Sequence, residues 1–462
     1  MRALLDGRYA PPLPRRARDT AELAALSAMR FRRDGGQVRV SDEAPSASLV
    51  AVGDISFKFD EDATRECRRE LVTGVVPVLR SADLRVANLE SVLTVERQKA
   101  GPTGSFLRGA PAHLETLAAA GIDAVTCANN HCLDYGPDAL AESLAHLRDA
   151  GIGACGAGEG DAARAPAILD ARGLRVGMLG YTDDCNVAPR WGGGPRAAEA
   201  NDAEVVEDVR RLRERVDLVV LQLHWGYEWT MYPLLSHRDR ARRFAEAGAD
   251  VVLCHHAHVP MGVEAWRGRV IAYGLGNFLF GWRMPQAHPW RNRAHLLRVD
   301  FNERGVTGAT LIPCGTVPDG RVVTLGGPAR REVLGAHGVL RDGLQDDRML
   351  GALETDRTIR QARAYVLRFA RAAEQGAAEV VQGMARSLHL PRQRALLAAL
   401  EEDGIAGGPD VAAHLRTLAG IADSPGAALD AAALKAGTPQ WQALEQLGAE
   451  PRLRHRPLGR IP

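Results

Sequence analysis

The sequence predicts an α/β protein in which polar and ionisable side chains gather where strands end. Three observations predict this: short runs rich in β-branched residues, helical stretches between the runs, and acids, amides and histidines directly after them. The carboxyl ends of neighbouring parallel strands meet at one edge of a sheet, where α/β proteins build their binding sites. We therefore expect a layered β/α domain with a site at its strand ends.

The expected strands are short apolar runs, as in sheets that are covered on both faces. The runs that precede the polar segments are residues 48–52, 84–87, 124–126, 218–223 and 251–253. Apolar residues recur at helical spacing between them, over residues 111–120 and 138–150. Strands alternating with helices favour parallel pairing.

Six residues that follow these strands have the chemistry of metal ligands. They are Asp54, Glu90, Asn130, His224, His256 and His258. Carboxylates, amide oxygens and imidazoles suit divalent metals, and the set contains no cysteine pair, which makes a structural zinc ribbon a poor interpretation. Six ligands exceed what one tetrahedral ion needs, and a carboxylate can bridge, so two neighbouring metals are indicated. Such a pair is typical of hydrolytic enzymes.

The order of the polar segments resembles that of a known family. The segments are Gly53-Asp54, Asn88-Leu89-Glu90, Ala128-Asn129-Asn130-His131 followed by Asp134-Tyr135-Gly136, His224 to Glu228, His256 to Val259, and Tyr273 to Phe278. Together, over about residues 47–316, they resemble the CapA family of capsule (poly-γ-glutamate) synthesis proteins, which is similar to calcineurin-like metallophosphoesterases. The resemblance implies a four-layer α/β/β/α sandwich, preceded by an N-terminal extension at 1–46. Beyond residue 316, where the resemblance ends, helical spacing and proline breaks predict a mainly helical C-terminal extension at 317–462.

The metallophosphoesterase plan implies a role for each ligand. The first metal would be held by Asp54 and His258, Glu90 would bridge, and the second metal would be held by Asn130, His224 and His256. His131 would remain beside the metals as the general acid that protonates a leaving group. The cofactors would be two divalent ions, among manganese, zinc and iron.

Two departures from the phosphoesterase pattern bear on this assignment. Ser56 stands two residues after Asp54, where phosphoesterases usually have a histidine, and Glu90 replaces the usual bridging aspartate. The first metal should therefore bind more weakly or be absent. Because a fold does not fix a reaction, phosphate-ester chemistry does not follow from the resemblance alone.

Two residues beside the proposed ligands have open roles. Asp134 would either orient His131 through a hydrogen bond or cap the helix that follows. His255 precedes His256, and adjacent strand residues point in opposite directions, so only one of the two can join His258 on the same side. We interpret His255 as structural.

Four residues are candidates for substrate contacts. Glu228 would contact substrate or hold His224, or it is a rim carboxylate paired with an arginine. Asn277 would contact substrate or hydrogen-bond the backbone. Arg283 and Arg291 lie in the loop 281–293, which together with the loop 181–199 would cover an anionic small-molecule or polymer substrate, since guanidinium groups bind carboxylate and phosphate bidentately. The alternative is that both loops are solvated surface.

Composition restricts the class of protein. The 462 residues carry 58 basic and 57 acidic side chains, a formal net charge of +1, which gives no support to a nucleic-acid partner. We expect no membrane span, because no stretch approaches the roughly 20 apolar residues required, and no signal peptide, because residues 1–40 lack an apolar core. Seven cysteines without C-x-x-C spacing predict free thiols and a cytoplasmic protein.

The hypothesis from sequence is a cytoplasmic metal-dependent hydrolase acting on a phosphoester or a γ-glutamyl or other polycarboxylate substrate. The alternative is a non-catalytic accessory subunit of a poly-γ-glutamate or related biosynthetic complex. Helical stretches expected from residue 358 onward would cover the sheet edge, form a homo-oligomer contact or dock a partner of such a complex. No Gly-x-x-x-x-Gly-Lys-Ser/Thr phosphate loop occurs, so an ATP-using synthetase has no support.

Overall fold

The protein is described by a computed structural model over residues 36–57, 65–100, 106–183, 193–280 and 290–354, and at residue 357. The chain divides into two compact units, Met1–Leu353 and Glu354–Pro462. All elements reported below belong to the first unit. Arg283 and the helical stretches predicted from residue 358 onward lie outside the described residues, as do residues 184–192 of the loop 181–199.

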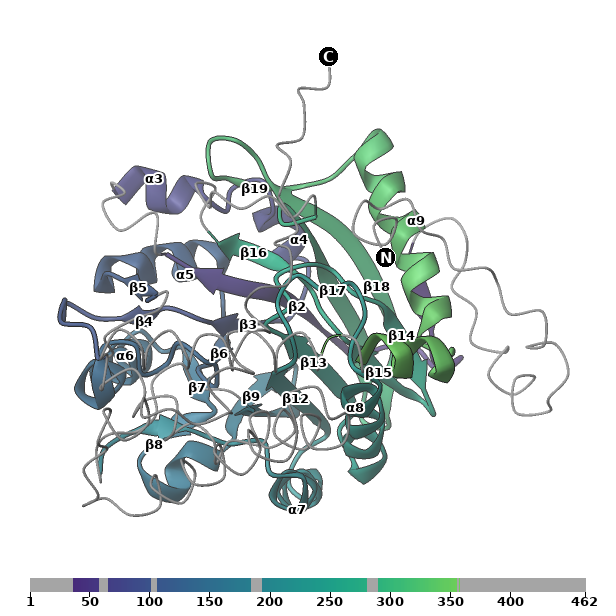
Figure 1. Cartoon of the computed structure of the whole chain (residues 1–462), viewed down its shortest axis with the longest axis horizontal. Helices are drawn as coiled ribbons and strands as arrows, with labels where there is room; N and C mark the ends of the chain where they lie inside the picture. Colours follow the sequence, from purple (N-terminus) through teal and green to yellow (C-terminus); the bar gives the residue numbers. More distant parts are fainter. Residues whose placement is uncertain are drawn as a thin grey trace, which may run out of the picture. The chain divides into compact units, whose positions relative to one another are not determined.

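Two sheets form the centre of the first unit (Figure 1). The larger has the order β1-β18-β17-β2-β3-β6-β7, with β16 beside β2 and β19 beside β18. Its strands are β1 (Gln37–Arg39), β2 (Ala47–Ser56), β3 (Leu84–Leu89), β6 (Ala124–Thr126), β7 (Gly153–Cys155), β16 (Asn277–Phe280), β17 (Arg293–Asn302), β18 (Gly305–Thr316) and β19 (Val322–Thr324). Strands β2, β3, β6 and β7 pair in parallel.

The smaller sheet has six strands in the order β14-β15-β13-β12-β10-β9. They are β9 (Ala167–Ala171), β10 (Leu174–Thr182), β12 (Leu218–His224), β13 (Val251–His255), β14 (Val263–Trp266) and β15 (Arg269–Ala272). Strands β10, β12, β13 and β15 are parallel. Two short pairs, β4 (Val92–Leu93) with β5 (Arg108–Gly109) and β8 (Ala157–Gly158) with β11 (Arg196–Ala197), lie outside both sheets.

The described helices connect the strands. They are α3 (Arg65–Glu70), α4 (Val76–Leu79), α5 (Leu114–Ala120), α6 (Gly136–Asp149), α7 (Asp202–Arg213), α8 (Leu235–Ala247) and α9 (Gly327–Gly343). Local chemistry sets their ends: the Asn201 side chain caps α7 by accepting from the backbone N–H groups of Ala203 and Glu204. Apolar residues at helical spacing, Val205, Val209 and Leu212, then bury one face of α7.

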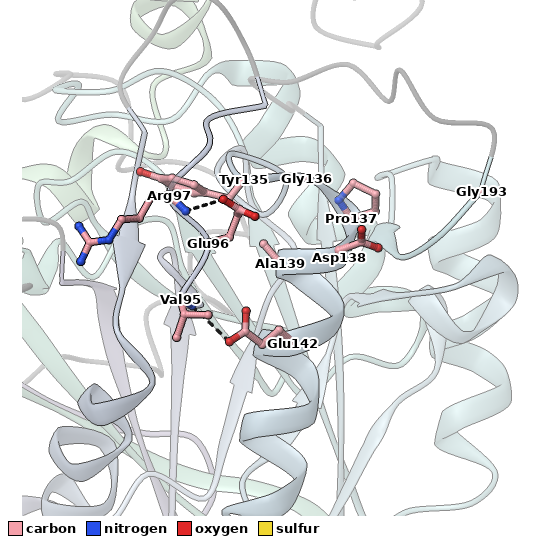
Figure 2. Close-up of a pocket in the computed structure, with 10 residues that line it drawn as sticks. All are labelled: Val95, Glu96, Arg97, Tyr135, Gly136, Pro137, Asp138, Ala139, Glu142 and Gly193. Carbon is pink, nitrogen blue, oxygen red and sulfur yellow. Dashed lines mark hydrogen bonds between the residues drawn. The ribbon is translucent and has the colours of Figure 1, made fainter.

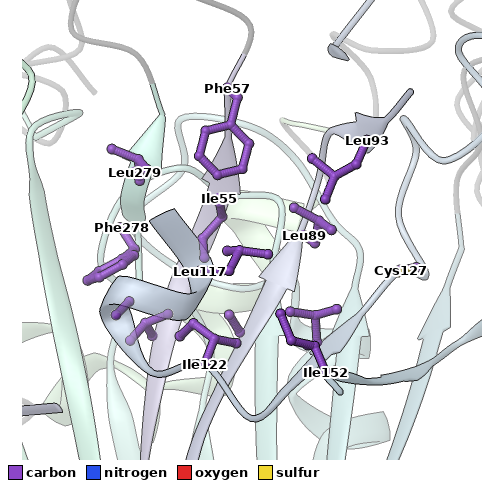
Figure 3. Close-up of a cluster of buried hydrophobic side chains, with 14 of the residues drawn as sticks. Ile55, Phe57, Leu89, Leu93, Leu117, Ile122, Cys127, Ile152, Phe278 and Leu279 are labelled. Carbon is purple, nitrogen blue, oxygen red and sulfur yellow. The ribbon is translucent and has the colours of Figure 1, made fainter. Parts of the chain in front are cut away.

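Three apolar clusters stack these elements in four layers. Residues of both sheets, such as Val86 and Leu253, form one cluster between the sheets. A second cluster joins the larger sheet to α4, α5 and α6, and Figure 3 shows part of it, including Leu89 of β3 and Leu117 of α5. The third joins the smaller sheet to α7 and α8. The predicted α/β/β/α class is confirmed, and the five strands expected before the polar segments are β2, β3, β6, β12 and β13.

The first compact unit continues past residue 316, where the sequence places the start of a helical extension. Strand β19 pairs with β18, and His337 of α9 accepts a hydrogen bond from the backbone N–H of Val263 at 3.0 Å. At the other end, β1 pairs with β18 although it precedes residue 47. These contacts tie both flanking segments to the sheets.

Two glycines let β2 and β16 meet where the site is built. A Cβ on Gly53 would lie 1.8 Å from the carbonyl oxygen of Gly276, and Gly276 itself has φ +78°. Only glycine fits such an approach. As a result the Asp54 N–H donates to the Gly276 carbonyl at 3.0 Å, and Asn277 pairs in register with Asp54.

Two expectations about the chain can be compared with the structure. Within the described ranges, no helix combines the length and the apolar character that a bilayer crossing demands. Six of the seven cysteines are described, and all six are free thiols; Cys67 is exposed and the other five are buried.

Candidate metal centre

The strand ends of both sheets bring the six predicted ligands together. Asp54 lies near the end of β2, Glu90 directly after β3, and Asn130 after β6. The smaller sheet contributes His224 at the end of β12, and His256 and His258 after β13. Each is at most 4% exposed, so the site lies in the interior between the carboxyl ends of the two sheets.

One group of ligand atoms surrounds the Nε2 atom of His224. Asn130 Oδ1 lies 2.9 Å from it, His256 Nδ1 lies 3.1 Å from it, and Glu90 Oε1 lies 3.9 Å from it. Ligand atoms of Glu90, His224 and His256 all lie within 4.8 Å of one another. These are the residues predicted for the second metal and its bridge.

A second group contains Asp54, His258 and again Glu90. His258 Nδ1 lies 3.4 Å from Asp54 Oδ2, and His258 Nε2 lies 3.6 Å from Glu90 Oε1. The three residues meet the same 4.8 Å spacing for ligand atoms. Glu90 therefore belongs to both groups, the position that a bridging carboxylate requires.

Glu90 is the residue whose surroundings fit a cation best. Both carboxylate oxygens are buried and have no hydrogen-bond partner in the described part of the chain. Burial raises the pKa of Glu90 well above its usual range; His258 opposes the rise and the charge of Asp54 adds to it. A buried carboxylate without hydrogen bonds is costly unless a cation meets it. The donor set around Glu90 fits a divalent metal.

The histidines of the two groups differ in charge. Burial lowers the pKa of His258, but Glu90 and Asp54 outweigh this and raise it to about 10. Burial, together with the charges of His255 and His258, holds the pKa of His224 well below its usual value. His224 is thus neutral, the form of imidazole that binds a metal. Burial raises the pKa of Asp54, yet hydrogen bonds from His255 and His258 keep it well below its usual range.

Three residues that the sequence did not mark as site residues hold the ligands in place. His255 Nδ1 lies 2.9 Å from Asp54 Oδ1, and His255 Nε2 lies 2.9 Å from Gln222 Oε1. Asn88 donates from Nδ2 to Asp54 Oδ1 at 2.9 Å, and the same nitrogen lies 3.2 Å from His224 Nδ1. Partners of this kind orient metal ligands. Asn88 stands two residues before Glu90, and this spacing could have indicated that Asn88 belongs to the site.

Strand alternation did not place His255 correctly relative to His258, because both rings reach Asp54. Strand β13 ends at His255, and the next residues leave the extended conformation. His256 has φ +83° and His258 has φ +57°, both in the left-handed region. The rule of opposite faces therefore stops at His255.

His131 and Asp134 form a pair beside Glu90. His131 Nδ1 lies 2.7 Å from Asp134 Oδ2, which also accepts the N–H of Leu107 at 2.6 Å. His131 Nε2 lies 3.9 Å from Glu90 Oε1. Helix α6 begins at Gly136 after Tyr135, which makes no side-chain capping bond. Of the two roles considered for Asp134, orientation of His131 is the one with a contact in the structure.

The residues predicted to contact substrate are only partly placed. Glu228 is exposed and accepts from Trp229 Nε1 at 3.0 Å. Asn277 Oδ1 lies 2.9 Å from His258 Nδ1, and Asn277 Nδ2 donates to the carbonyl of Arg291 at 3.4 Å. Asn277 thus links the carbonyl of Arg291 to the candidate ligand His258.

The position that departs from the phosphoesterase pattern is occupied by a buried hydroxyl pair. Ser91 Oγ donates to Ser56 Oγ at 2.9 Å and accepts the N–H of Phe57 at 3.0 Å. Ser56 is 1% exposed. Its side chain links the end of β2 to the segment after Glu90.

A cavity of about 690 Å³ lies at the start of α6 (Figure 2). Its walls are the segment after Glu90, including Glu96 and Arg97, and the first turns of α6, including Asp138 and Glu142. None of the six predicted metal ligands lines it. Its volume is in the range of small-molecule pockets, but its lining has more acids than bases, which does not favour an anionic ligand.

Acids, amides and histidines thus converge from both sheets of an α/β/β/α sandwich, in groups that could hold a metal ion. The chain belongs to the bacterial capsule synthesis protein family (PGA_cap), whose family model matches residues 48–282. The CapA resemblance inferred from the ordered motifs is confirmed.

Named relatives agree with this membership. The chain is similar to the PGA biosynthesis protein CapA of Bacillus subtilis, with 30% identity over 52% of this chain and 65% of the relative. A capsule biosynthesis protein CapA of Bacillus anthracis is 29% identical over 51% and 60%. A probable polyglutamine synthesis accessory protein of Mycobacterium tuberculosis is 28% identical over 43% and 55%. The chain thus spans less than two thirds of the length of these relatives.

Solved structures show a more distant likeness. A NAD nucleotidase of Haemophilus influenzae matches with a TM-score of 0.36 and 13% identity, covering 67% of this chain and 60% of that one. A 5'-nucleotidase from Candida albicans matches with a TM-score of 0.35 and 11% identity over the same shares. Likeness at these scores supports no inference about this chain.

Proposed function

We propose that the protein is a metal-dependent hydrolase whose centre holds two divalent metals. The observation that carries this proposal is Glu90, a buried carboxylate that has no hydrogen-bond partner among the described residues and is shared by two groups of candidate ligands. A charge in that position is stabilised by cations on either side. The manganese, zinc or iron pair, when bound, supplies Lewis-acid activation of substrate and water at neutral pH.

Different residues would bind each metal, and others orient these ligands. Asp54, Glu90 and His258 would hold one metal, and Glu90 would reach the second, with the remaining ligands Asn130, His224 and His256. His255 and Asn88 fix the orientation of Asp54 through the hydrogen bonds described above. The Ser56–Ser91 pair replaces a ligand at the first metal, so that metal should bind less tightly.

His131 would act as the general acid. The Asp134 carboxylate holds Nδ1 at 2.7 Å and fixes the ring, so that Nε2 faces Glu90 at 3.9 Å. A proton on Nε2 can then be donated to a leaving group bound beside the metals. Asp134 positions the ring, and we assign it no direct contact with substrate.

The substrate we propose is a γ-glutamyl or other polycarboxylate compound, or a phosphoester. Names of the relatives, which refer to PGA and capsule biosynthesis, support the first class. The metal-centre chemistry is compatible with both, because an acyl and a phosphoryl centre each gain from Lewis-acid activation and a proton donor. Asn277, which contacts His258, and the exposed Glu228 would contact the substrate at the rim.

The test compares two histidine variants of the full chain for turnover and metal content. Protein loaded with manganese, zinc or iron is screened against phosphomonoesters, phosphodiesters and γ-glutamyl amides. We expect His131→Ala to lose about 10²–10⁴-fold in turnover with its metal content intact. His146→Ala is the control, because His146 lies on α6 and contacts Glu142 away from the predicted ligands. Unchanged turnover in His131→Ala would remove it from the mechanism.

A second candidate function is a non-catalytic accessory subunit. Two observations favour it: Ser56 in place of a ligand, and a relative named as a probable accessory protein of polyglutamine synthesis. The two functions differ in one result. If metal-loaded protein turns over none of the screened compounds, the accessory role replaces the hydrolase.

A further inference from the structure

Besides the two groups that share Glu90, the described residues contain a third group of candidate metal ligands. It consists of Glu228, His256 and His258, whose ligand atoms lie within 4.8 Å of one another. It differs from the other two groups in exposure, because Glu228 reaches solvent while every member of the other groups is buried. An ion that comes from solvent would therefore meet Glu228 before the inner ligands.

Because the three groups share ligands, they cannot all bind a metal at the same time. The two inner groups have only Glu90 in common, and a carboxylate has two oxygens, so it can bind one metal with each. The outer group shares His256 with one inner group and His258 with the other. A neutral imidazole has a single acceptor nitrogen and binds one metal. Filling the outer position therefore takes a ligand from each inner position.

The backbone that holds this outer group in place has a strained conformation. Trp229, His256 and His258 have φ values of +60°, +83° and +57°, in the left-handed region that non-glycine residues rarely adopt. The Trp229 N–H donates to the Ala257 carbonyl at 2.8 Å, and the Trp229 ring lies 5.3 Å from that of His258. Such strain persists where the surrounding structure fixes it, and it gathers at functional sites.

We propose that Glu228, His256 and His258 form an entry position, where a divalent metal is captured from solvent before His256 and His258 turn to the inner positions. This inference rests on the proposed metal centre and adds a route into it. Glu228 would be a temporary ligand, present during loading and release but absent from the filled centre. The stoichiometry would be two metals, because a third would compete for histidines already in use.

The experiment follows zinc uptake by metal-free, full-length protein. Wild type, Glu228→Gln and Glu228→Asp are mixed with Zn²⁺ in a stopped-flow instrument, and free zinc is read with a fluorescent indicator. Release is then measured after addition of excess chelator, and final content by elemental analysis. Glu207→Gln is the matched control, since Glu207 is also an exposed carboxylate but pairs with Arg211 on α7.

A temporary ligand predicts a specific combination of results. Glu228→Gln should take up zinc about tenfold more slowly, because charged groups at an entrance raise cation on-rates by about 10–10³-fold. Release should slow by the same factor, and the final content should stay at two. Glu228→Asp should fall between, and Glu207→Gln should match wild type.

Other results overturn the inference and are distinguishable from one another. Uptake at the wild-type rate in Glu228→Gln would exclude an entry position. Lower final content with faster release would make Glu228 a permanent ligand. Absence of zinc binding in wild type would reject the proposed metal centre, and the entry position with it.

Discussion

The Glu90→Gln variant tests most sharply whether the site lowers the stability of the metal-free protein and in return binds metal. Glu90→Gln replaces the carboxylate by an amide of the same shape. Among the described residues the wild-type oxygens have no hydrogen-bond partner, whereas the amide carries no charge and can donate toward the neutral ring of His224, whose Nε2 lies 3.9 Å from Glu90 Oε1 in wild type. We expect metal-free Glu90→Gln to be more stable than wild type by about 1–3 kcal/mol, the cost of an unsatisfied buried polar group.

Added metal should reverse this order. A ligand at 100 times its dissociation constant stabilises the folded state by about 2.7 kcal/mol, and wild type should gain this while Glu90→Gln, without its bridging charge, should not. Thermal unfolding is measured by circular dichroism in EDTA and in excess Mn²⁺ or Zn²⁺. A shift of about 2 °C or less is expected per kcal/mol, because the shift falls with domain size and the compact unit spans Met1–Leu353.

A buried glutamate outside the site provides the contrast. Glu264 accepts hydrogen bonds from Arg242 at 2.7 and 2.8 Å and from Tyr273 at 2.7 Å. Glu264→Gln should therefore destabilise the protein both with and without metal. The reasoning is refuted if Glu90→Gln is less stable than wild type in EDTA, or if metal stabilises the two proteins equally.

Three further outcomes follow from the structure. Asp134→Asn should lower turnover about 10–100-fold with unchanged metal content, since it weakens the support of His131; equal turnover would exclude the pair. Gly53→Ala should destabilise by at least about 3 kcal/mol because its Cβ meets the Gly276 carbonyl, whereas Gly335→Ala, in open space on α9, should stabilise by about 0.5–1 kcal/mol, both by urea unfolding. Burial lowers the pKa of His295 from 6.5 to about 4, so the unfolded chain binds more protons between these values. Stability should fall by about 3 kcal/mol as pH decreases across that window, and His295→Leu should remove this share of the slope.

The sequence predicted the central strands because each is an apolar run that ends in a polar segment. It did not predict β17 and β18, which are mostly buried and pair with each other but are not followed by one of the polar segments. It likewise did not predict that α9 would pack beside β14, where the buried His337 accepts the backbone N–H of Val263. Long-range pairing cannot be inferred from local pattern alone.

The positions of the candidate ligands could be predicted for a similar reason. Asp54, Glu90 and His224 each stand at a strand end, so their positions follow from the strands. His255 could not be placed, because its orientation depends on backbone dihedral angles that change at His256. The residue types at such positions do not reliably indicate that the backbone there is strained.

The central claim is that Glu90 joins two metals, and metal content per chain tests it most directly. Full-length protein purified without chelator or affinity nickel is reconstituted with manganese, zinc or iron, and its metal is measured by elemental analysis beside His256→Ala. The account predicts two equivalents in wild type and a sharp fall in the variant, because His256 Nδ1 lies 3.1 Å from His224 Nε2 within one ligand group. No bound metal after reconstitution, or the same content in both proteins, would contradict it.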